Sequence, residues 1–368
     1  MPLLDAIKAL ACLVIVGHHL TRYGPMSEVA YPLAPDLIHW LSNDGRLAVQ
    51  VFLVLAGFLA AGSLAPEGRS RADRTLPRIA QRYARLVMPY LAALSFSLVV
   101  ALIVRPWLSA DIVPAPPTFW QLCAHGLLLQ DLLGYSALSA GVWYVAIDFQ
   151  LFVLALVAVG SAAWLEQRWP AGSRNARWLT VSLVLALATG SLVYFNRHSE
   201  LDITALYFFG AYGIGMLTYW IGRATRPGTW RLAMLLLAAL GLVALALDWR
   251  SRIAVALVTA LGLALAQRSA WLSSPDWPAW TTPLLQVGRM SYSLFLIHFP
   301  VILLVNAAFV RWVPDAPWID AIGMLLALTA SLAAASVLYR CVETRPASWR
   351  AVLGLFAGLV ACGLLVSL

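Results

Sequence analysis

Charged side chains are scarce in this sequence of 368 residues. Only 11% of the residues are Asp, Glu, Lys or Arg, whereas 61% are hydrophobic, and soluble domains carry about 25% charged residues. A chain this apolar cannot cover a water-facing surface, so we expect it to be surrounded by lipid. Long hydrophilic stretches are also lacking, which leaves no room for a soluble domain. The net charge of +8 then reflects membrane topology, and we expect no nucleic-acid partner.

Cysteine and lysine are nearly absent too. The four cysteines, Cys12, Cys123, Cys341 and Cys362, form no C-x-x-C pair and lie near no histidine at metal-binding spacing. This excludes the usual disulfide framework and the usual zinc site, so no metal is expected. Of the 25 basic residues only Lys8 is a lysine.

Long apolar runs are what the sequence has in abundance. A membrane-spanning helix needs about 20 apolar residues, and eleven runs approach this length, so the predicted fold is an all-α polytopic membrane protein. The predicted spans are 5–22, 47–64, 84–104, 143–164, 178–195, 203–222, 232–248, 253–269, 289–310, 319–340 and 351–367. Between them, 118–134 is expected to form a short re-entrant or interfacial helix.

The basic residues indicate an orientation for these spans. With the N-terminus in the cytoplasm, 18 of the 25 Lys and Arg residues fall on the cytoplasmic side and 7 on the other. This excess follows the positive-inside rule. We therefore expect a cytoplasmic N-terminus and an extracytoplasmic C-terminus.

Ionisable residues within spans are costly, which makes them functional candidates. In the first span, Lys8 and His19 are eleven residues apart, within roughly 20° of one helix face and about 16 Å apart along the axis. Asp5 shares the Lys8 face, whereas His18 points elsewhere. The alternative is that Lys8 only anchors the helix and that the histidine bonds a neighbouring helix.

A second candidate region is a stripe of arginines. Pro77 suits the first turn of a helix, and Arg78, Arg82 and Arg85 then follow on one face. Such a stripe at a cytoplasmic surface is able to bind phosphates in bidentate fashion. The alternative is a lipid-facing cluster that only sets topology.

Polar residues interrupt two further apolar helices. Asp148 and Gln150 lie about two turns or less inside the outer surface, where a carboxylate must pair with an arginine or reach a water-filled cavity. His298 lies near mid-span beside Pro300, where a lone histidine is usually structural.

Six segments, taken in order, resemble the acyltransferase-3 family of membrane O-acyltransferases. The hallmark of that family is a basic residue, ten residues and then a histidine, which Lys8 and His19 match. The other similar segments are AVQVFLVLAGFL (48–59), the arginine pair Arg82 and Arg85 with Pro89 and Tyr90, VWYVAIDFQLF (142–152), SYSLFLIHFP (291–300) and YRCVETRP (339–346). Gln50 stands where the family often has Asp, Ala56 where it has Ser, and Asp148 where it has Glu.

The resemblance implies an acyl-CoA-dependent O-acyltransferase. Residues 1–346 would form the transmembrane domain, and 347–368 one additional C-terminal helix. His19 would act as the catalytic base with Asp148 in a supporting or acceptor-binding role. The donor-binding residues would be Lys8, Arg78, Arg82 and Arg85. Further site candidates are Asp5, Trp143, Gln150, Tyr292, His298 and Glu343.

The resemblance also implies the partners of the protein. These are acyl-CoA as co-substrate, acetyl-CoA above all, with no permanently bound cofactor, and an extracytoplasmic carbohydrate or glycolipid as acceptor. The expected location is the inner membrane of a bacterium. Two other functions remain open at this point: a transporter of a small solute or lipid-linked sugar, and a non-catalytic partner in polysaccharide export.

Overall fold

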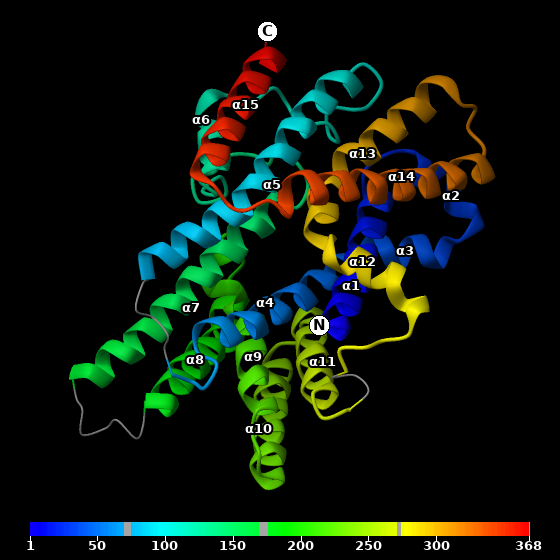
Figure 1. The fold of residues 1–368 in the computed structure, drawn as a ribbon. Coiled ribbons are helices and arrows are strands. Elements are labelled where there is room, and N and C mark those ends of the chain that lie inside the picture. Colours follow the sequence, from blue (N-terminus) through cyan, green and yellow to red (C-terminus); the bar gives the residue numbers. More distant parts are fainter. Residues whose placement is uncertain (70–74, 169–175, 271–273, 368) are drawn as a thin grey trace. The chain divides into compact units, whose positions relative to one another are not determined.

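The computed structural model describes residues 1–69, 75–168, 176–270 and 274–367, and this part of the chain is helical with no β-strand (Figure 1). The predicted all-α class is confirmed. Three arginines that contributed to the topology count, Arg71, Arg74 and Arg174, lie outside the described residues.

Nine helical segments in the described ranges are long and apolar enough to cross a membrane. They are Pro2–Arg22, Pro35–Leu64, Thr75–Val104, Val142–Arg168, Trp178–Arg197, Pro227–Leu247, Ser291–Trp312, Pro317–Glu343 and Trp349–Ser367. The other two predicted spans are also helical. α11 (Ser251–Ala266) is shorter, with 16 residues, and the glycines and tyrosines of α9 (Ala205–Gly222) lower its mean hydropathy. The chain is therefore a polytopic membrane protein.

The chain divides into two compact units. The first comprises Met1–Leu4, Val49–Ala80 and Ile147–Pro278. It contains α4 (Val49–Leu64), the start of α5 (Thr75–Val104), most of α7 (Val142–Arg168), α8 (Ala176–Val193), the short helices η4 (Phe195–Arg197) and η5 (Ser199–Leu201), α9, α10 (Pro227–Leu247) and α11.

Within this first unit, α9 is central and packs against α4, α8 and α11. Glycine allows its closest approach: a Cβ on Gly57 of α4 would lie 1.8 Å from the Tyr212 carbonyl oxygen, and one on Gly215 would lie 2.1 Å from that of Val54. Small residues of this kind let membrane helices approach backbone to backbone. α10, by contrast, exposes Leu232, Leu235 and Leu242, as expected of a lipid-facing helix.

The second unit comprises Asp5–Ala48, Gln81–Ala146 and Ala279–Leu368. It contains most of α1 (Pro2–Arg22), α2 (Met26–Ala30), η1 (Tyr31–Leu33), α3 (Pro35–Asp44), η2 (Gly45–Ala48), the rest of α5, α6 (Phe119–Gly126), the start of α7, η6 (Ala279–Thr281), α12 (Thr282–Arg289), α13 (Ser291–Trp312), α14 (Pro317–Leu338), the π-helical turn η7 (Tyr339–Glu343) and α15 (Trp349–Ser367).

In this second unit α14 packs against α13 and α2, and α15 packs against α6. α13 continues through Pro300 to Trp312. Of the segment 118–134 only α6 is an α-helix, and it begins with a capping box in which Thr118 and Gln121 bond each other's backbone N–H. The predicted domain boundary at residue 346 stays a prediction.

Candidate active site

Two histidines from distant parts of the chain meet in the second unit. His19 lies near the end of α1 and His298 near the middle of α13, and their Nδ1 and Nε2 atoms are 2.5 Å apart. The rings stack, with centroids 4.8 Å apart and planes inclined by 14°. The His298 side chain is buried, and that of His19 is half-buried. Sequence reasoning had treated these histidines as separate features.

The hydrogen bonds of this pair fix which ring nitrogens carry protons. His298 Nδ1 lies 3.0 Å from the Leu294 carbonyl oxygen, which only accepts, so this nitrogen must donate. The Nε2 atom of neutral His298 is then an acceptor, and His19 Nδ1 must donate to it. It follows that the unprotonated nitrogen of neutral His19 is Nε2, and this atom is able to accept a proton from another group.

The two histidines meet because α1 and α13 run side by side in register. The Cys12 thiol lies 3.4 Å from the Ser291 carbonyl oxygen, and His19 meets His298 seven residues further along both helices. Seven residues are about two helical turns, or roughly 10.5 Å of rise. Both helices therefore run in the same direction here, and the register at Ser291 carries through to the histidine pair.

His18 does not join the pair by hydrogen bonding. Its Nδ1 donates to the Leu41 carbonyl oxygen on α3, at 2.9 Å. His19 therefore faces α13 and His18 faces α3, as expected for adjacent residues about 100° apart around a helix.

Near the start of α1, Lys8 forms an ion pair with Asp5, with 2.7 Å between Nζ and Oδ1. Close packing holds this end of the helix, since a Cβ on Gly288 of α12 would lie 1.8 Å from the Asp5 carbonyl oxygen. Any phosphate at Lys8 would therefore share the ammonium group with the Asp5 carboxylate.

Glu343 is held at the start of α13. Its Oε2 accepts hydrogen bonds from the Ser293 N–H at 3.1 Å and from the Ser293 hydroxyl at 2.5 Å. The charges of Lys8 and Arg85 also act on this carboxylate. Residues predicted from three separate segments are thus gathered in one part of the second unit.

Tyr292 and the arginines lie along α5. The Tyr292 hydroxyl donates to the Leu86 carbonyl oxygen at 2.8 Å, which ties α13 to α5. Arg78, Arg82 and Arg85 follow one another on this continuous helix, Arg78 in the first unit and the other two in the second. Arg85 is exposed and the other two are half-buried.

The remaining candidates lie on α7. Trp143 is half-buried at its start, in the second unit, and packs edge-on against Tyr144. Asp148 belongs to the first unit and is only 5% exposed. Gln150 has a structural contact, because its Oε1 accepts a hydrogen bond from the Ala205 N–H at the start of α9, at 3.1 Å. The role of Asp148 toward His19 stays a prediction.

Sequence reasoning missed three contributors to this arrangement. Ser293 binds Glu343, the Leu294 carbonyl oxygen sets the proton position in the histidine pair, and Tyr23 packs edge-on against His19 with centroids 5.3 Å apart. Ser293 lies within the segment 291–300, which resembles the family, so that resemblance could have pointed to it. The role of a backbone carbonyl group cannot be recognised from a sequence.

The helices and this intramembrane cluster define a polytopic membrane protein with a polar site among its spans. A family model described as an acyltransferase domain matches residues 2–340. The chain therefore belongs to the acyltransferase-3 family and is a membrane acyltransferase. Searches of curated proteins and of solved structures found no match.

Proposed function

We propose that this acyltransferase moves an acyl group from cytoplasmic acyl-CoA to a hydroxyl of an extracytoplasmic glycan or glycolipid, with His19 as the general base. The observation that carries the proposal is the hydrogen-bonded histidine pair. It leaves the Nε2 atom of His19 unprotonated, in a helix whose other end carries Lys8.

The chemical step needs one proton acceptor. An alcohol attacks a thioester efficiently only if its proton is removed during attack, and neutral imidazole is the usual base near pH 7. The acceptor oxygen forms a bond to the thioester carbon as its proton moves to His19 Nε2. The tetrahedral intermediate then collapses, the carbon–sulfur bond breaks, and His19 returns the proton to the departing CoA sulfur. His298 holds the imidazole in the required tautomer throughout.

The basic residues fit the other end of the donor. Acyl-CoA joins a phosphate-rich nucleotide to a long thin arm that carries the thioester at its tip. Arg78, Arg82 and Arg85 would bind the phosphates, with Lys8 sharing its charge between a phosphate and Asp5. The distance of about 16 Å from Lys8 to His19 along α1 suits the length of the arm.

We further propose acetyl-CoA as the donor and the inner membrane of a bacterium as the location, with the N-terminus in the cytoplasm. In this arrangement the acyl group crosses the bilayer inside the protein. Asp148 would orient the reacting groups or bind the acceptor.

The test is transfer by the purified protein in lipid nanodiscs. Radiolabelled acetyl-CoA is supplied with candidate glycan acceptors, and both CoA release and label on the acceptor are measured. We expect acceptor-dependent CoA release that disappears in His19→Ala. No donor binding, and no CoA release with any acceptor, would contradict the proposal.

A further inference from the structure

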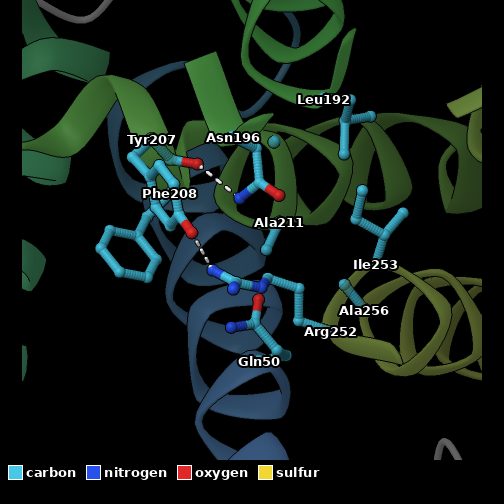
Figure 2. A pocket seen from close by; sticks show the side chains of 10 residues that line it. Gln50, Leu192, Asn196, Tyr207, Phe208, Ala211, Arg252, Ile253 and Ala256 are labelled. Carbon is cyan, nitrogen blue, oxygen red and sulfur yellow. Dashed lines mark hydrogen bonds between the residues drawn. The ribbon is translucent and has the colours of Figure 1, made fainter. Parts of the chain in front are cut away.

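The first unit contains a pocket with an arginine among mainly apolar walls, and the mechanism above does not use it. It opens where four segments of this unit come together, and Figure 2 shows the side chains around it. It is lined by Gln50, Leu192, Asn196, Tyr207, Phe208, Gly210, Ala211, Arg252, Ile253 and Ala256. Gln50 lies at the start of α4, Tyr207 at the start of α9, Arg252 at the start of α11, and Asn196 just after α8.

The pocket carries a positive charge that its own walls do not neutralise. The lining residues include one arginine and no acidic residue. The Arg252 guanidinium donates to the Tyr207 hydroxyl oxygen and lies 5.1 Å from the centroid of that ring. Both contacts are with a neutral partner, so neither supplies a counter-charge. In Figure 2 the guanidinium points into the pocket beside the Gln50 amide.

The acidic residue that precedes α11 is already engaged elsewhere. Asp248 accepts a hydrogen bond from Arg250 at 2.8 Å and lies 3.8 Å from Arg197. The hydrogen bond from Arg250 holds the pKa of Asp248 below its usual value, and the charges of Arg250 and Arg197 act in the same direction. Glu200 and Asp202 are exposed in the segment between α8 and α9. Counted with Asp248 they balance Arg197, Arg250 and Arg252, so the uncompensated charge is the local one of Arg252 inside the pocket.

Helix geometry adds to the positive potential. Arg252 lies in the first turn of α11, and Arg250 at its N-cap makes no side-chain capping bond. The N-terminal end of a helix carries a partial positive charge and backbone N–H groups that favour an anion. The first turn of α11 and the guanidinium of Arg252 therefore attract the same kind of group.

The pocket also contains a buried acceptor that needs a donor. Asn196 is 7% exposed, and its Nδ2 donates to the Tyr207 carbonyl oxygen at 3.0 Å. Its Oδ1 is buried and has no hydrogen-bond partner among the described residues. An unsatisfied buried polar atom costs free energy, and a ligand hydroxyl would satisfy it.

We infer that this pocket binds the anionic group of an acidic sugar, with a carboxylate or phosphate at Arg252 and a neighbouring hydroxyl donating to Asn196 Oδ1. The empty space is about 230 Å³ with the open mouth included. In the inferred complex the charged group lies at Arg252 and the sugar ring lies in the mouth.

The inference deepens the proposed function, because it rests on that proposal for the role of the sugar as acceptor. In the predicted topology, α4, α9 and α11 all begin on the extracytoplasmic side, where an exported glycan would arrive. An acidic sugar unit bound here would make the enzyme selective for charged over neutral glycans.

Equilibrium binding to the full chain in nanodiscs of neutral lipid, without any acyl donor, tests this directly. The probes are glucuronate, glucose 6-phosphate and glucose. We expect saturable binding of at least one anionic sugar, weakened by salt, and no comparable binding of glucose. Whichever anion binds more tightly identifies the charged group.

Two variants and a matched control locate the site. Arg252→Gln removes the guanidinium, and Gln50→Glu introduces a carboxylate beside it, so each should weaken anion binding about tenfold or more. Arg223→Gln is the control, because Arg223 also lies over a tyrosine ring, that of Tyr219 at 5.8 Å, near the other end of α9. It should bind like the wild type.

Three outcomes would overturn the inference: equal binding of glucose and the anionic sugars, no binding of either anion, or an equal loss in Arg223→Gln. A variant that does not fold is recognised by its thermal unfolding, and the other variant then decides. Acetyl-CoA binding is measured in the same preparations. A wild-type protein that does not bind acetyl-CoA would count against the proposed function. A wild-type protein that binds acetyl-CoA but no anionic sugar would count only against the inference about the pocket.

Discussion

At the scale of single residues, the histidine pair explains how one nitrogen of one imidazole is left unprotonated. The Leu294 carbonyl oxygen sets the protonation of His298, and His298 sets that of His19. A partner that holds a reacting imidazole in one tautomer is a recurring element of general-base catalysis. His298 therefore acts through His19, and we treat it as a positioning residue.

Replacing His298 tests this positioning role. His298→Ala removes the acceptor for His19 Nδ1, so we expect kcat to fall at least about 10-fold and at most by the roughly 10⁴-fold seen when the orienting partner of a catalytic histidine is lost. His298→Gln keeps an acceptor oxygen and should retain more activity. The measurements are kcat, KM and the pH profile of both variants. Wild-type kcat in His298→Ala would show that the pair is only structural.

A third histidine gives a prediction for stability. His125 on α6 is buried, its Nδ1 donates to the Gln121 carbonyl oxygen at 2.8 Å, and its Nε2 accepts from the Leu138 N–H at 3.2 Å. Burial lowers the pKa of His125 from 6.5 to about 4. Above pH 6.5 the imidazole is neutral in both folded and unfolded chains. Between pH 6.5 and 4 only the unfolded chain binds the proton, so stability is lost as the pH falls.

Protonation of His125 in the unfolded chain should lower the free energy of unfolding by on the order of 3 kcal/mol at pH 4. The measurement is the thermal unfolding midpoint of the wild type and of His125→Gln across that range. The wild-type midpoint should fall more steeply than that of the variant, because the variant lacks the titrating group. His39→Gln, at an exposed histidine, is the control and should follow the wild type. Parallel curves for wild type and His125→Gln would contradict the prediction.

At the scale of elements, the sequence predicted the helices well and their contacts hardly at all. Each of the eleven apolar runs lies in a helix, because length and hydropathy are local properties that a span requires. The short helix α3 was missed because it is not apolar enough to be recognised as part of a span. The sequence placed Asp5 on the Lys8 face, and their spacing of three residues on one helix explains the ion pair that the structure shows.

The contact between His19 and His298 could not be predicted in this way. Helical periodicity places each residue on a face of its own helix but does not say which helix lies opposite. The two residues are 279 positions apart, and the register set where Cys12 meets Ser291 is a property of tertiary packing. Motif resemblance brought both histidines into consideration without joining them.

The arginine stripe on α5 is the element that should govern donor binding. Arg82→Ala or Arg85→Ala should weaken acetyl-CoA affinity by about 1.5–3 kcal/mol, the usual contribution of a hydrogen bond to a charged group. The affinity of the wild type should depend more on salt than that of the variants. Arg231→Ala, at an exposed arginine in the second turn of α10, is the control. Unchanged acetyl-CoA affinity in the α5 variants would show that these arginines do not bind the donor and only set the membrane topology.

At the scale of the whole molecule, the predicted orientation brings donor and acceptor to opposite sides of the membrane. The eleven predicted spans and the excess of basic residues on one side predict a cytoplasmic N-terminus and an extracytoplasmic C-terminus. A C-terminal alkaline phosphatase fusion should therefore be active in a bacterial host, and a C-terminal fusion to green fluorescent protein should be dark. The opposite pair of results would show that the C-terminus is cytoplasmic, and the sides of the membrane proposed for donor and acceptor would then be wrong.

The central claim is that the molecule transfers an acyl group with His19 as its base, and the adjacent histidines test it most directly. His19 contacts His298, whereas His18 contacts Leu41. A general base contributes typically 10²–10⁴-fold to a rate. The measurement is turnover of His19→Ala and His18→Ala, with acetyl-CoA binding determined in parallel. We predict a loss of at least about 100-fold in His19→Ala with donor binding intact, and most activity retained in His18→Ala. An active His19→Ala beside an inactive His18→Ala would contradict the account.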